Sequence, residues 1–297
     1  MRHLLIKTLV LASILTAGCI RLSPTASLPE QVGGPPLSCP KQMLAIPAGF
    51  YLSGSTKAER SWAYENGGTA AQKGLWYDRW DRPPTRRKTE PYCIDKTEVT
   101  QSAYANFVSA TGHRVPTITE AEYRAQGFLV HSYAEVKPYL WQNEQPPPGK
   151  LDHPVVLVSQ SDALSYCAWR GTSATSKPAS CSLPSEDMWE RAARGDNGHW
   201  FPWGNRWSKL NVNYAERFHG TTPVTRFVAA ASPFGMVDSV GNVFEWVNTA
   251  FKKTKRVVVK GCSWDDNAGL CRASARHGRP PQSRHILFGF RCSCRPN

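Results

Sequence analysis

Short apolar runs, each ended by glycine or proline, dominate the hydrophobic pattern of this chain. Residues 46–54 predict a short strand between turn residues, and residues 92–95 predict another. A helical period appears in few places and does not persist for long. The pattern therefore indicates an irregular fold of short strands and short helices, and it argues against an extensively helical protein.

Three segments combine the helical period with signals for a start or a stop. Thr100 can cap a helix that Gly112 ends. Ser161 can begin a second helix, because an acidic residue follows it where negative charge suits the helix dipole. Ser185 can cap a third helix, which Gly195 closes.

The composition agrees with a turn-rich domain. Residues 113–152 lack a period and contain the run Pro146-Pro147-Pro148-Gly149, so we expect a long irregular insertion there. The 297 residues include 22 Gly and 23 Pro, and the 11 Trp, 10 Tyr and 11 Phe suggest a largely aromatic core. Such a length is ample for a buried core, and 41% hydrophobic with 20% charged residues is globular composition.

The first 38 residues read as a targeting segment and a linker. Residues 1–18 place Arg2 and Lys7 around an apolar run that is shorter than the ~20 residues of a spanning helix. They end in small residues before Cys19, as signal peptides require. Residues 19–38 are rich in Pro, Gly and Ser and predict a flexible tether, which leaves residues 39–297 for the globular domain.

The end of the signal segment resembles a bacterial lipobox, which implies that Cys19 is lipidated and anchors the protein to a membrane. An ordinary cleaved signal is the alternative. The resemblance also implies an outer-membrane address, because position 20 is Ile rather than Asp. We therefore expect a lipid-anchored protein of the cell envelope whose displayed face the sequence leaves open.

The net charge of +13 admits nucleic acid, anionic lipid or acidic polysaccharide as partners. Export makes nucleic acid the least suitable of these, and the chain carries no recognisable nucleic-acid-binding motif. Its two basic clusters, at residues 86–88 and 252–256, are short and typical of solvated surface loops. We expect no nucleic-acid partner.

Of the nine cysteines, all but Cys19 lie in the globular part, and an even set in an exported chain is typical of disulfides. A zinc site is the alternative. The chain has no Cys-x-x-Cys pair, and Cys292 and Cys294 are too close for ordinary zinc spacing. Four disulfides are therefore expected, and the residues alone leave their pairing open.

Ordered motifs along residues 39–297 resemble one known family. These motifs occupy residues 46–50, 92–100, 154–159, 183–195, 202–205, 223–224, 234–238, 241–246, 260–264, 272–276 and 289–292. The set is similar to the sulfatase-modifying-factor, or formylglycine-generating-enzyme, family. The resemblance implies a single α+β domain with a C-type-lectin-like fold and little regular structure. It also implies disulfides between Cys167 and Cys292 and, more loosely, between Cys39 and Cys93.

The same resemblance locates the chemistry of the family's enzymes, which oxidise a cysteine in sulfatases with O2 and Cu(I) held by two thiolates. Counted from Ser263, Asp266 takes the first thiolate's place and Cys271 the second's. Counted back from Arg276, Cys271 falls where other members carry an apolar residue. A carboxylate is a hard ligand that suits Cu(I) poorly, so we expect no copper. Only an active enzyme would use Ser263, Trp264 and Cys271 as catalytic residues.

Residues 232–237 are similar to a family loop that binds Ca²⁺ largely through carbonyl oxygens, with Ser232 in place of the usual Asn. Calcium is therefore a candidate cofactor, with Ser232, Pro233, Gly235 and Val237 as its ligands. Two charged residues are expected to be structural instead. Glu245, between two aromatic residues, should be a buried, hydrogen-bonded carboxylate, and Arg291 should be a buried ion-pair partner.

Two functional hypotheses follow. The first is an exported envelope lipoprotein whose family domain is divergent or non-catalytic and binds a glycan, a peptide or a protein partner. The second is a formylglycine-generating or cysteine-oxidising oxygenase that acts on sulfatases. The incomplete thiolate pair favours the first, since fold alone does not decide function. No motif in the chain names the ligand.

Overall fold

Ten short strands form three small sheets in the part of the chain that the structure, a computed structural model, describes: residues 38–173, 180–252 and 254–295. The sheet orders are β1-β4-β10-β5, β2-β3 and β8-β7-β6-β9. The strands are β1 Met43–Ile46, β2 Gly49–Ser53, β3 Thr85–Thr89, β4 Tyr92–Asp95, β5 Ser180–Ser182, β6 Phe244–Ala250, β7 Val257–Lys260, β8 Arg276–Arg279, β9 Phe288–Phe290 and β10 Ser293–Arg295.

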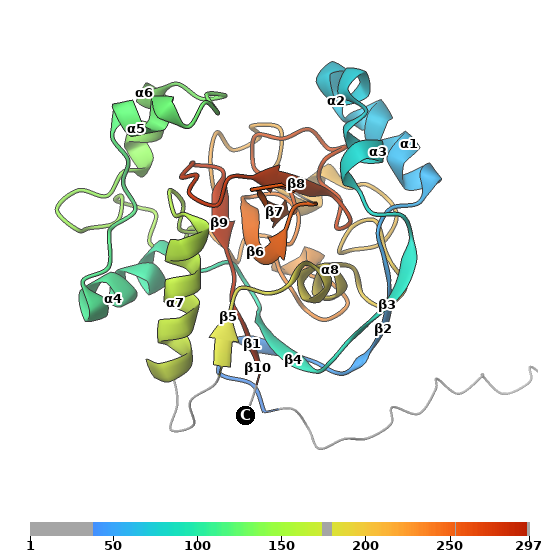
Figure 1. Cartoon of the computed structure of the whole chain (residues 1–297), viewed down its shortest axis with the longest axis horizontal. Coiled ribbons are helices and arrows are strands. Elements are labelled where there is room, and N and C mark those ends of the chain that lie inside the picture. The colour runs from blue at the N-terminus through green and yellow to red at the C-terminus, as the bar shows by residue number, and fades with distance from the viewer. Residues whose placement is uncertain (1–37, 174–179, 253, 296–297) are drawn as a thin grey trace, which may run out of the picture. The chain divides into compact units, whose positions relative to one another are not determined.

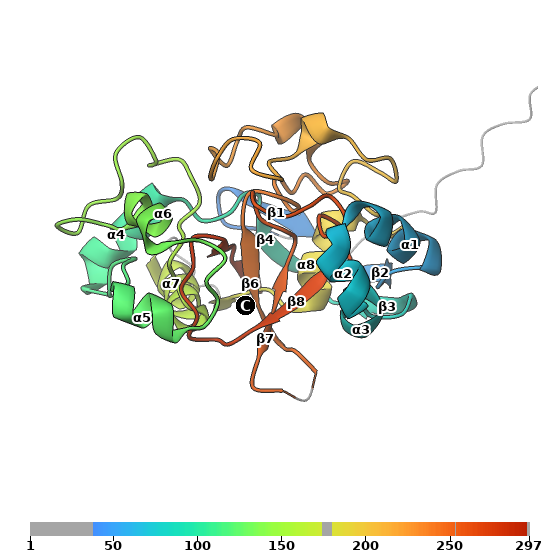
Figure 2. The ribbon, with the colours of Figure 1, turned by 90° about the horizontal axis from the view of Figure 1, so that it is seen from above.

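Most helices lie at the periphery of the domain, which comprises residues 37–297, but the helix at Glu186–Arg194 is almost wholly buried. The helices are α1 Lys57–Asn66, α2 Gly68–Gly74, α3 Trp76–Trp80, α4 Gln101–Thr111, α5 Glu120–Ala125, α6 Tyr133–Val136, α7 Gln160–Ser173 and α8 Glu186–Arg194. Short 3-10 turns cover Lys137–Tyr139, Lys209–Asn211 and Val228–Ala230. Figures 1 and 2 show α4–α7 on one side of the central sheet and α1–α3 on the opposite side.

This mixture of short helices and strands agrees with the expected α+β, lectin-like fold. The predicted signal segment, the lipidation site Cys19 and all but the last residue of the tether lie outside the described residues. Among the described residues no helix is long and apolar enough to cross a membrane.

The central sheet brings distant family motifs together. Strand β6 pairs antiparallel with β7 and parallel with β9, so that Glu245 lies between Lys260 and Gly289. The first four residues of β6 are buried, and a largely aromatic core packs around them. Trp246, for example, is fully buried and its indole donates to the carbonyl of Val158 at 3.0 Å. The expected aromatic core is therefore present.

The observed helix ends can be compared with the starts and stops that the sequence predicts. Helix α4 begins after the Thr100 cap and ends at Gly112, whose φ of 68° is the left-handed conformation that glycine adopts readily. Helix α8 begins after Ser185 and ends before Gly195, as predicted. Helix α7 begins at Gln160, one residue before the predicted Ser161.

The start of α7 shifts because Ser159, not Ser161, makes the capping bonds. The hydroxyl of Ser159 accepts from the amide of Asp162 at 3.3 Å, and the Asp162 carboxylate accepts from the amide of Ser159 at 2.8 Å. These reciprocal bonds form a capping box in which Ser159 is the N-cap, so the first helical residue is Gln160. The prediction of a helix here was right, and its first residue was wrong.

Helices α1–α3 and the helical part of the insertion carry weak sequence signals. Residues 57–80 are broken by glycines and show no long apolar face, so sequence reasoning did not place helices there. Within the insertion, Thr119 and Ser132 each make a full capping box that starts a short helix, α5 and α6. The insertion at 113–152 is therefore irregular but partly helical.

Four disulfides join the eight cysteines of the domain. The two pairs implied by the family resemblance are present, Cys39–Cys93 and Cys167–Cys292. Cys181 pairs with Cys294, because strands β5 and β10 place these residues opposite each other. The fourth bond, Cys262–Cys271, closes a short loop with a sequence separation of 9.

The expected structural role of Glu245 and Arg291 is confirmed. The guanidinium of Arg291 donates from Nε and from one terminal nitrogen to the two Glu245 oxygens, each at 2.7 Å. The indole of Trp189 donates to the same carboxylate, also at 2.7 Å. The three side chains are at most 1% exposed. Their hydrogen bonds therefore connect β6, α8 and the segment after β9 inside the apolar core.

Candidate functional site

The site implied by the family resemblance begins directly after β7. Gly261, with φ of 72°, turns the chain, and Ser263 and Trp264 follow. The Asp266 carboxylate accepts hydrogen bonds from both the amide and the hydroxyl of Ser263. Burial of the carboxyl group, opposed by these bonds, raises the pKa of Asp266 to about 6. Asp266, the residue predicted at the first thiolate's place, therefore holds Ser263 in a closed turn.

Cys271 takes part in a structural bond at this site. Its sulfur is bonded to Cys262, and both residues are 0% exposed. The sequence hypothesis of an active enzyme requires Cys271 as a thiolate beside Ser263. The structure instead uses it to tie the loop after Trp264 back to the end of β7.

A second loop runs along this segment and completes the wall of the site. The amide of Glu216 donates to the Trp264 carbonyl at 2.7 Å, and the amide of Ala215 donates to the Asp266 carbonyl at 3.0 Å. Ala215, Glu216 and His219 have φ values of 48°, 55° and 52°, which are uncommon for residues other than glycine. Such strained backbone is frequent at functional sites, where the surrounding structure holds it in place.

These segments border an open cavity of about 330 Å³, with Trp264 among its walls. Half of the lining comes from the insertion and half from the family core: Glu135, Pro138, Tyr139 and Lys150, and Glu216, His219, Trp264 and Ile286. Sequence reasoning found Trp264 but missed the others. The insertion residues belong to no motif and show no periodicity, so only their position in space reveals them.

His131 connects the insertion to the family segment behind this cavity. Its ring packs on Trp264 with centroids 5.0 Å apart, and its two nitrogens lie 3.3 Å from Glu135 and 3.4 Å from Asp265. Burial lowers the pKa of His131, but the two carboxylates more than offset it, and the pKa lies above its ordinary value. The ring therefore links α6 to the segment after β7 electrostatically.

A second histidine, His285, remains neutral in the same region. Burial, with the nearby charges of His131 and Arg279, lowers its pKa to about 3. Its Nε2 lies 2.9 Å from the Tyr123 hydroxyl, and its Nδ1 accepts from the amide of Leu287 at 3.3 Å. Because Nδ1 accepts, the neutral ring carries its proton on Nε2 and donates it to Tyr123.

The candidate calcium loop makes many internal hydrogen bonds. The Ser232 hydroxyl donates to the Ala192 carbonyl at 2.6 Å and accepts from the amide of Met236 at 3.1 Å. The carbonyl of Ser232 accepts from Gly235 at 2.8 Å, and that of Val237 accepts from the Arg291 guanidinium at 2.9 Å. The carbonyls of Ser232 and Val237 therefore already accept a hydrogen bond, whereas among the described residues no donor reaches the carbonyls of Pro233 and Gly235. Calcium binding stays a prediction.

Comparison with known proteins places this geometry in a family. The domain described as "Sulfatase-modifying factor enzyme 1-like domain" matches residues 30–295. The chain is 31% identical to the "Inactive C-alpha-formylglycine-generating enzyme 2" of Bos taurus, over 71% of this chain and 79% of that protein. It is 27% identical to the "Formylglycine-generating enzyme" of Bos taurus, over 94% of this chain and 81% of the enzyme.

A solved structure with the same fold is PvdO from Pseudomonas aeruginosa. It has a TM-score of 0.63 and 21% sequence identity, and the match covers 85% of this chain and 93% of PvdO. At this identity the likeness speaks for the fold alone. By their names, the sequence relatives include both an inactive protein and an enzyme. Relatedness therefore does not decide whether this chain is active, and the evidence must come from its own residues.

Proposed function

The chain belongs to the family of sulfatase-modifying factor enzyme 1-like domains, and on that premise we propose that it is a divergent, non-catalytic member. In this proposal the protein binds a peptide, glycan or protein segment in the cavity beside Trp264 and does not oxidise cysteine. It is exported and held at the cell envelope, at the outer membrane, by a lipid on Cys19. The relatives at similar identity include one that is named inactive, which is compatible with loss of the reaction.

One observation carries the proposal: the sulfur atoms near Ser263 form a buried disulfide, Cys262–Cys271. Cu(I) chemistry of the family's kind needs two thiolates at one open position. Here both sulfurs are oxidised and covered, and the nearest replacement, Asp266, is a carboxylate that is already hydrogen-bonded to Ser263. The chemistry of the donor set does not fit a copper centre.

The cavity has the features of a binding site. The rings of Trp264 and Tyr139 supply apolar faces, and Glu135, Glu216 and Lys150 supply charged groups of both signs. The indole Nε1 of Trp264 is buried and has no hydrogen-bond partner among the described residues. Because this nitrogen is closed to solvent, the apolar rings and the charged groups of the lining, and not this donor, support ligand binding.

The alternative function is the cysteine-oxidising oxygenase. The 27% identity with a formylglycine-generating enzyme over nearly the whole chain supports it. It requires that Cys262 and Cys271 be reduced in the working protein and that their segment opens to solvent. The two functions therefore differ in the redox state of one pair of sulfurs.

Counting thiols and measuring copper binding distinguishes them. In the chain carrying Cys19→Ser, we expect no free thiol under denaturing, non-reducing conditions. We also expect no stoichiometric Cu(I) uptake against a competing chelator and no aldehyde from a Cys-x-Pro-x-Arg peptide. The matched control is Cys262→Ala with Cys271→Ala, which should behave identically in the copper and peptide assays. Two reactive thiols, tight Cu(I) binding that this control abolishes, and peptide conversion would establish the oxygenase instead.

A further inference from the structure

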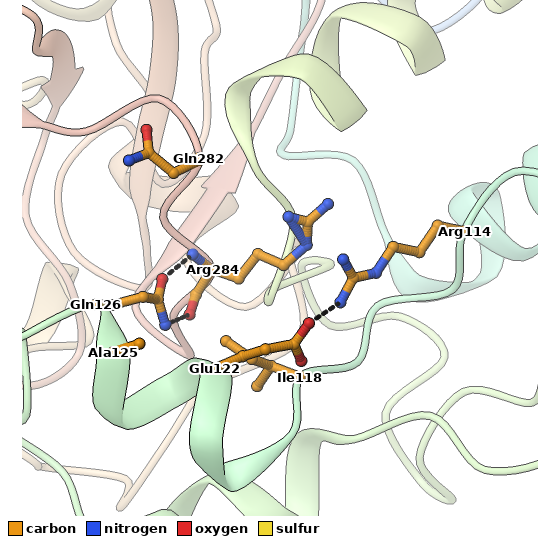
Figure 3. Close-up of a pocket in the computed structure, with 7 residues that line it drawn as sticks. All are labelled: Arg114, Ile118, Glu122, Ala125, Gln126, Gln282 and Arg284. Carbon is orange, nitrogen blue, oxygen red and sulfur yellow. Dashed lines mark hydrogen bonds and ion pairs between the residues drawn. The ribbon is translucent and has the colours of Figure 1, made fainter.

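A second cavity lies on the other side of the segment 282–286. Its volume is about 320 Å³ (Figure 3). Its lining residues come from the insertion and from the loop before β9: Arg114, Ile118, Glu122, Ala125 and Gln126, and Gln282 and Arg284. Arg284 lines this cavity and Ile286 lines the one beside Trp264, with buried His285 between them. The two cavities are therefore separate, and this one contains none of the residues implied in family chemistry.

The position of Arg284 is fixed by bonds to two other elements. The Gln126 side chain accepts from the backbone amide of Arg284 at 2.6 Å and donates to its carbonyl at 3.1 Å. The guanidinium lies 2.6 Å from the Asp162 carboxylate at the start of α7. Because hydrogen bonds hold the backbone amide and carbonyl of Arg284 and an ion pair holds its guanidinium, the cation has a defined position at the edge of the cavity.

Arg114 extends toward Arg284 from the opposite side (Figure 3). One of its terminal nitrogens donates to the Thr117 carbonyl at 2.8 Å and lies 3.9 Å from the Glu122 carboxylate. A guanidinium has five N–H donors in a planar fork. Among the described residues, each of these two arginines uses its donors only in part, and the remaining N–H groups are free to meet a ligand.

The rest of the lining mixes polar and apolar side chains: Glu122, Gln126, Gln282, Ile118 and Ala125. Ala125 is exposed, and Ile118, which is 4% exposed, adds a small apolar surface next to it. Two guanidiniums suit the planar, bidentate geometry of a carboxylate better than a single cation would. An apolar surface next to them suits a ligand with a carbon body rather than a bare inorganic ion.

From this arrangement we propose that the cavity between α5 and the segment 282–286 binds a small organic carboxylate. Its carboxylate group lies between Arg114 and Arg284, and its apolar part rests on Ile118 and Ala125. Glu122 competes with the ligand for Arg114, because its carboxylate is the acidic group on the cavity wall. A sugar acid and the C-terminus of a peptide both have this chemistry, and the experiment separates them.

The probes are N-acetyl-leucinate for a peptide terminus, galacturonate for a sugar acid, N-acetyl-leucinamide for the uncharged analogue and inorganic phosphate for a bare anion. Binding to the purified chain is measured by calorimetry and by ligand-observed NMR. We expect one of the two organic carboxylates to bind at least tenfold more tightly than the amide and phosphate. We expect Arg114→Gln to weaken that binding about tenfold, since it removes a charge-assisted contact.

Two further variants sharpen the test. Glu122→Gln should strengthen binding severalfold, because it removes the competing carboxylate, although it also weakens the start of α5. Arg124→Gln is the matched control on the same helix, since its side chain is 71% exposed and pairs with Glu120 away from the cavity. It should leave binding unchanged.

Equal binding of the amide and the carboxylate, or equal effects of Arg114→Gln and Arg124→Gln, would overturn the proposal. Binding of phosphate alone would also overturn it, because a bare anion makes no use of Ile118. The result is independent of the proposed function, since copper uptake and thiol content report on Cys262 and Cys271 and not on this cavity.

Discussion

Replacing Arg291 with methionine tests whether the buried ion pair holds the core together. Five hydrogen bonds leave this guanidinium: two go to Glu245 and one each to the carbonyls of Asp95, Lys96 and Val237. All five N–H donors are thus used, in a side chain with 0% exposure. No ordinary substitute reproduces this pattern, lysine included, because it has three donors and no fork.

The expected cost follows from the charges that remain. Arg291→Met leaves the Glu245 carboxylate in the core without its cation, and breaking a buried pair in this way costs about 3–5 kcal/mol. Burial, partly offset by Arg291, already raises the pKa of Asp238 to about 8, so this carboxyl group is largely protonated at neutral pH and adds little to the cost of losing the guanidinium. Against a total stability of roughly 5–15 kcal/mol, the loss is severe.

The measurement is urea unfolding followed by tryptophan fluorescence, with the disulfides intact. The double variant Glu245→Gln with Arg291→Met should lose less than the sum of the two single variants, because it leaves no buried, unpaired carboxylate at position 245. The exposed Arg124→Met serves as control and should cost under about 0.5 kcal/mol. If Arg291→Met costs no more than Arg124→Met, or if the two core substitutions are additive, the ion-pair reasoning fails.

Three other predictions concern pH, calcium and the anchor. The folded pKa of His285, about 3, lies below its unfolded value, so the unfolded state binds more protons and stability falls as the pH drops below about 6.5. His285→Gln should therefore reduce the difference in the free energy of unfolding between pH 7 and pH 5; an unchanged difference would contradict this. If the loop at Ser232 binds Ca²⁺ with a roughly micromolar to millimolar dissociation constant, the melting temperature rises in 1 mM CaCl2 relative to EDTA, because a ligand that binds the folded state stabilises it. Equal melting temperatures would rule the ion out. Metabolic labelling with a palmitate analogue should mark the chain in a bacterial host, and Cys19→Ser should abolish the label; persistent labelling would remove the lipid assignment.

Local signals predicted the ends of several helices correctly. Thr100 and Ser185 start helices because their hydroxyls bond amides three residues ahead, and Gly112 and Gly195 end them because glycine accepts a positive φ. Such features depend on neighbours within one helical turn. The ordered motifs also identified the family and the burial of Glu245 and Arg291.

Contacts between distant residues were decided only in three dimensions. Cys181 meets Cys294 across 113 residues because two strands pair, and Arg114 approaches Arg284 because the insertion folds back on the loop before β9. The short bond Cys262–Cys271 depends on the path of the loop between them. The sequence shows which side chains are available, but the packing of the core determines which of them meet. Many pairings close loops at similar entropic cost, and only the complete core favours one of them.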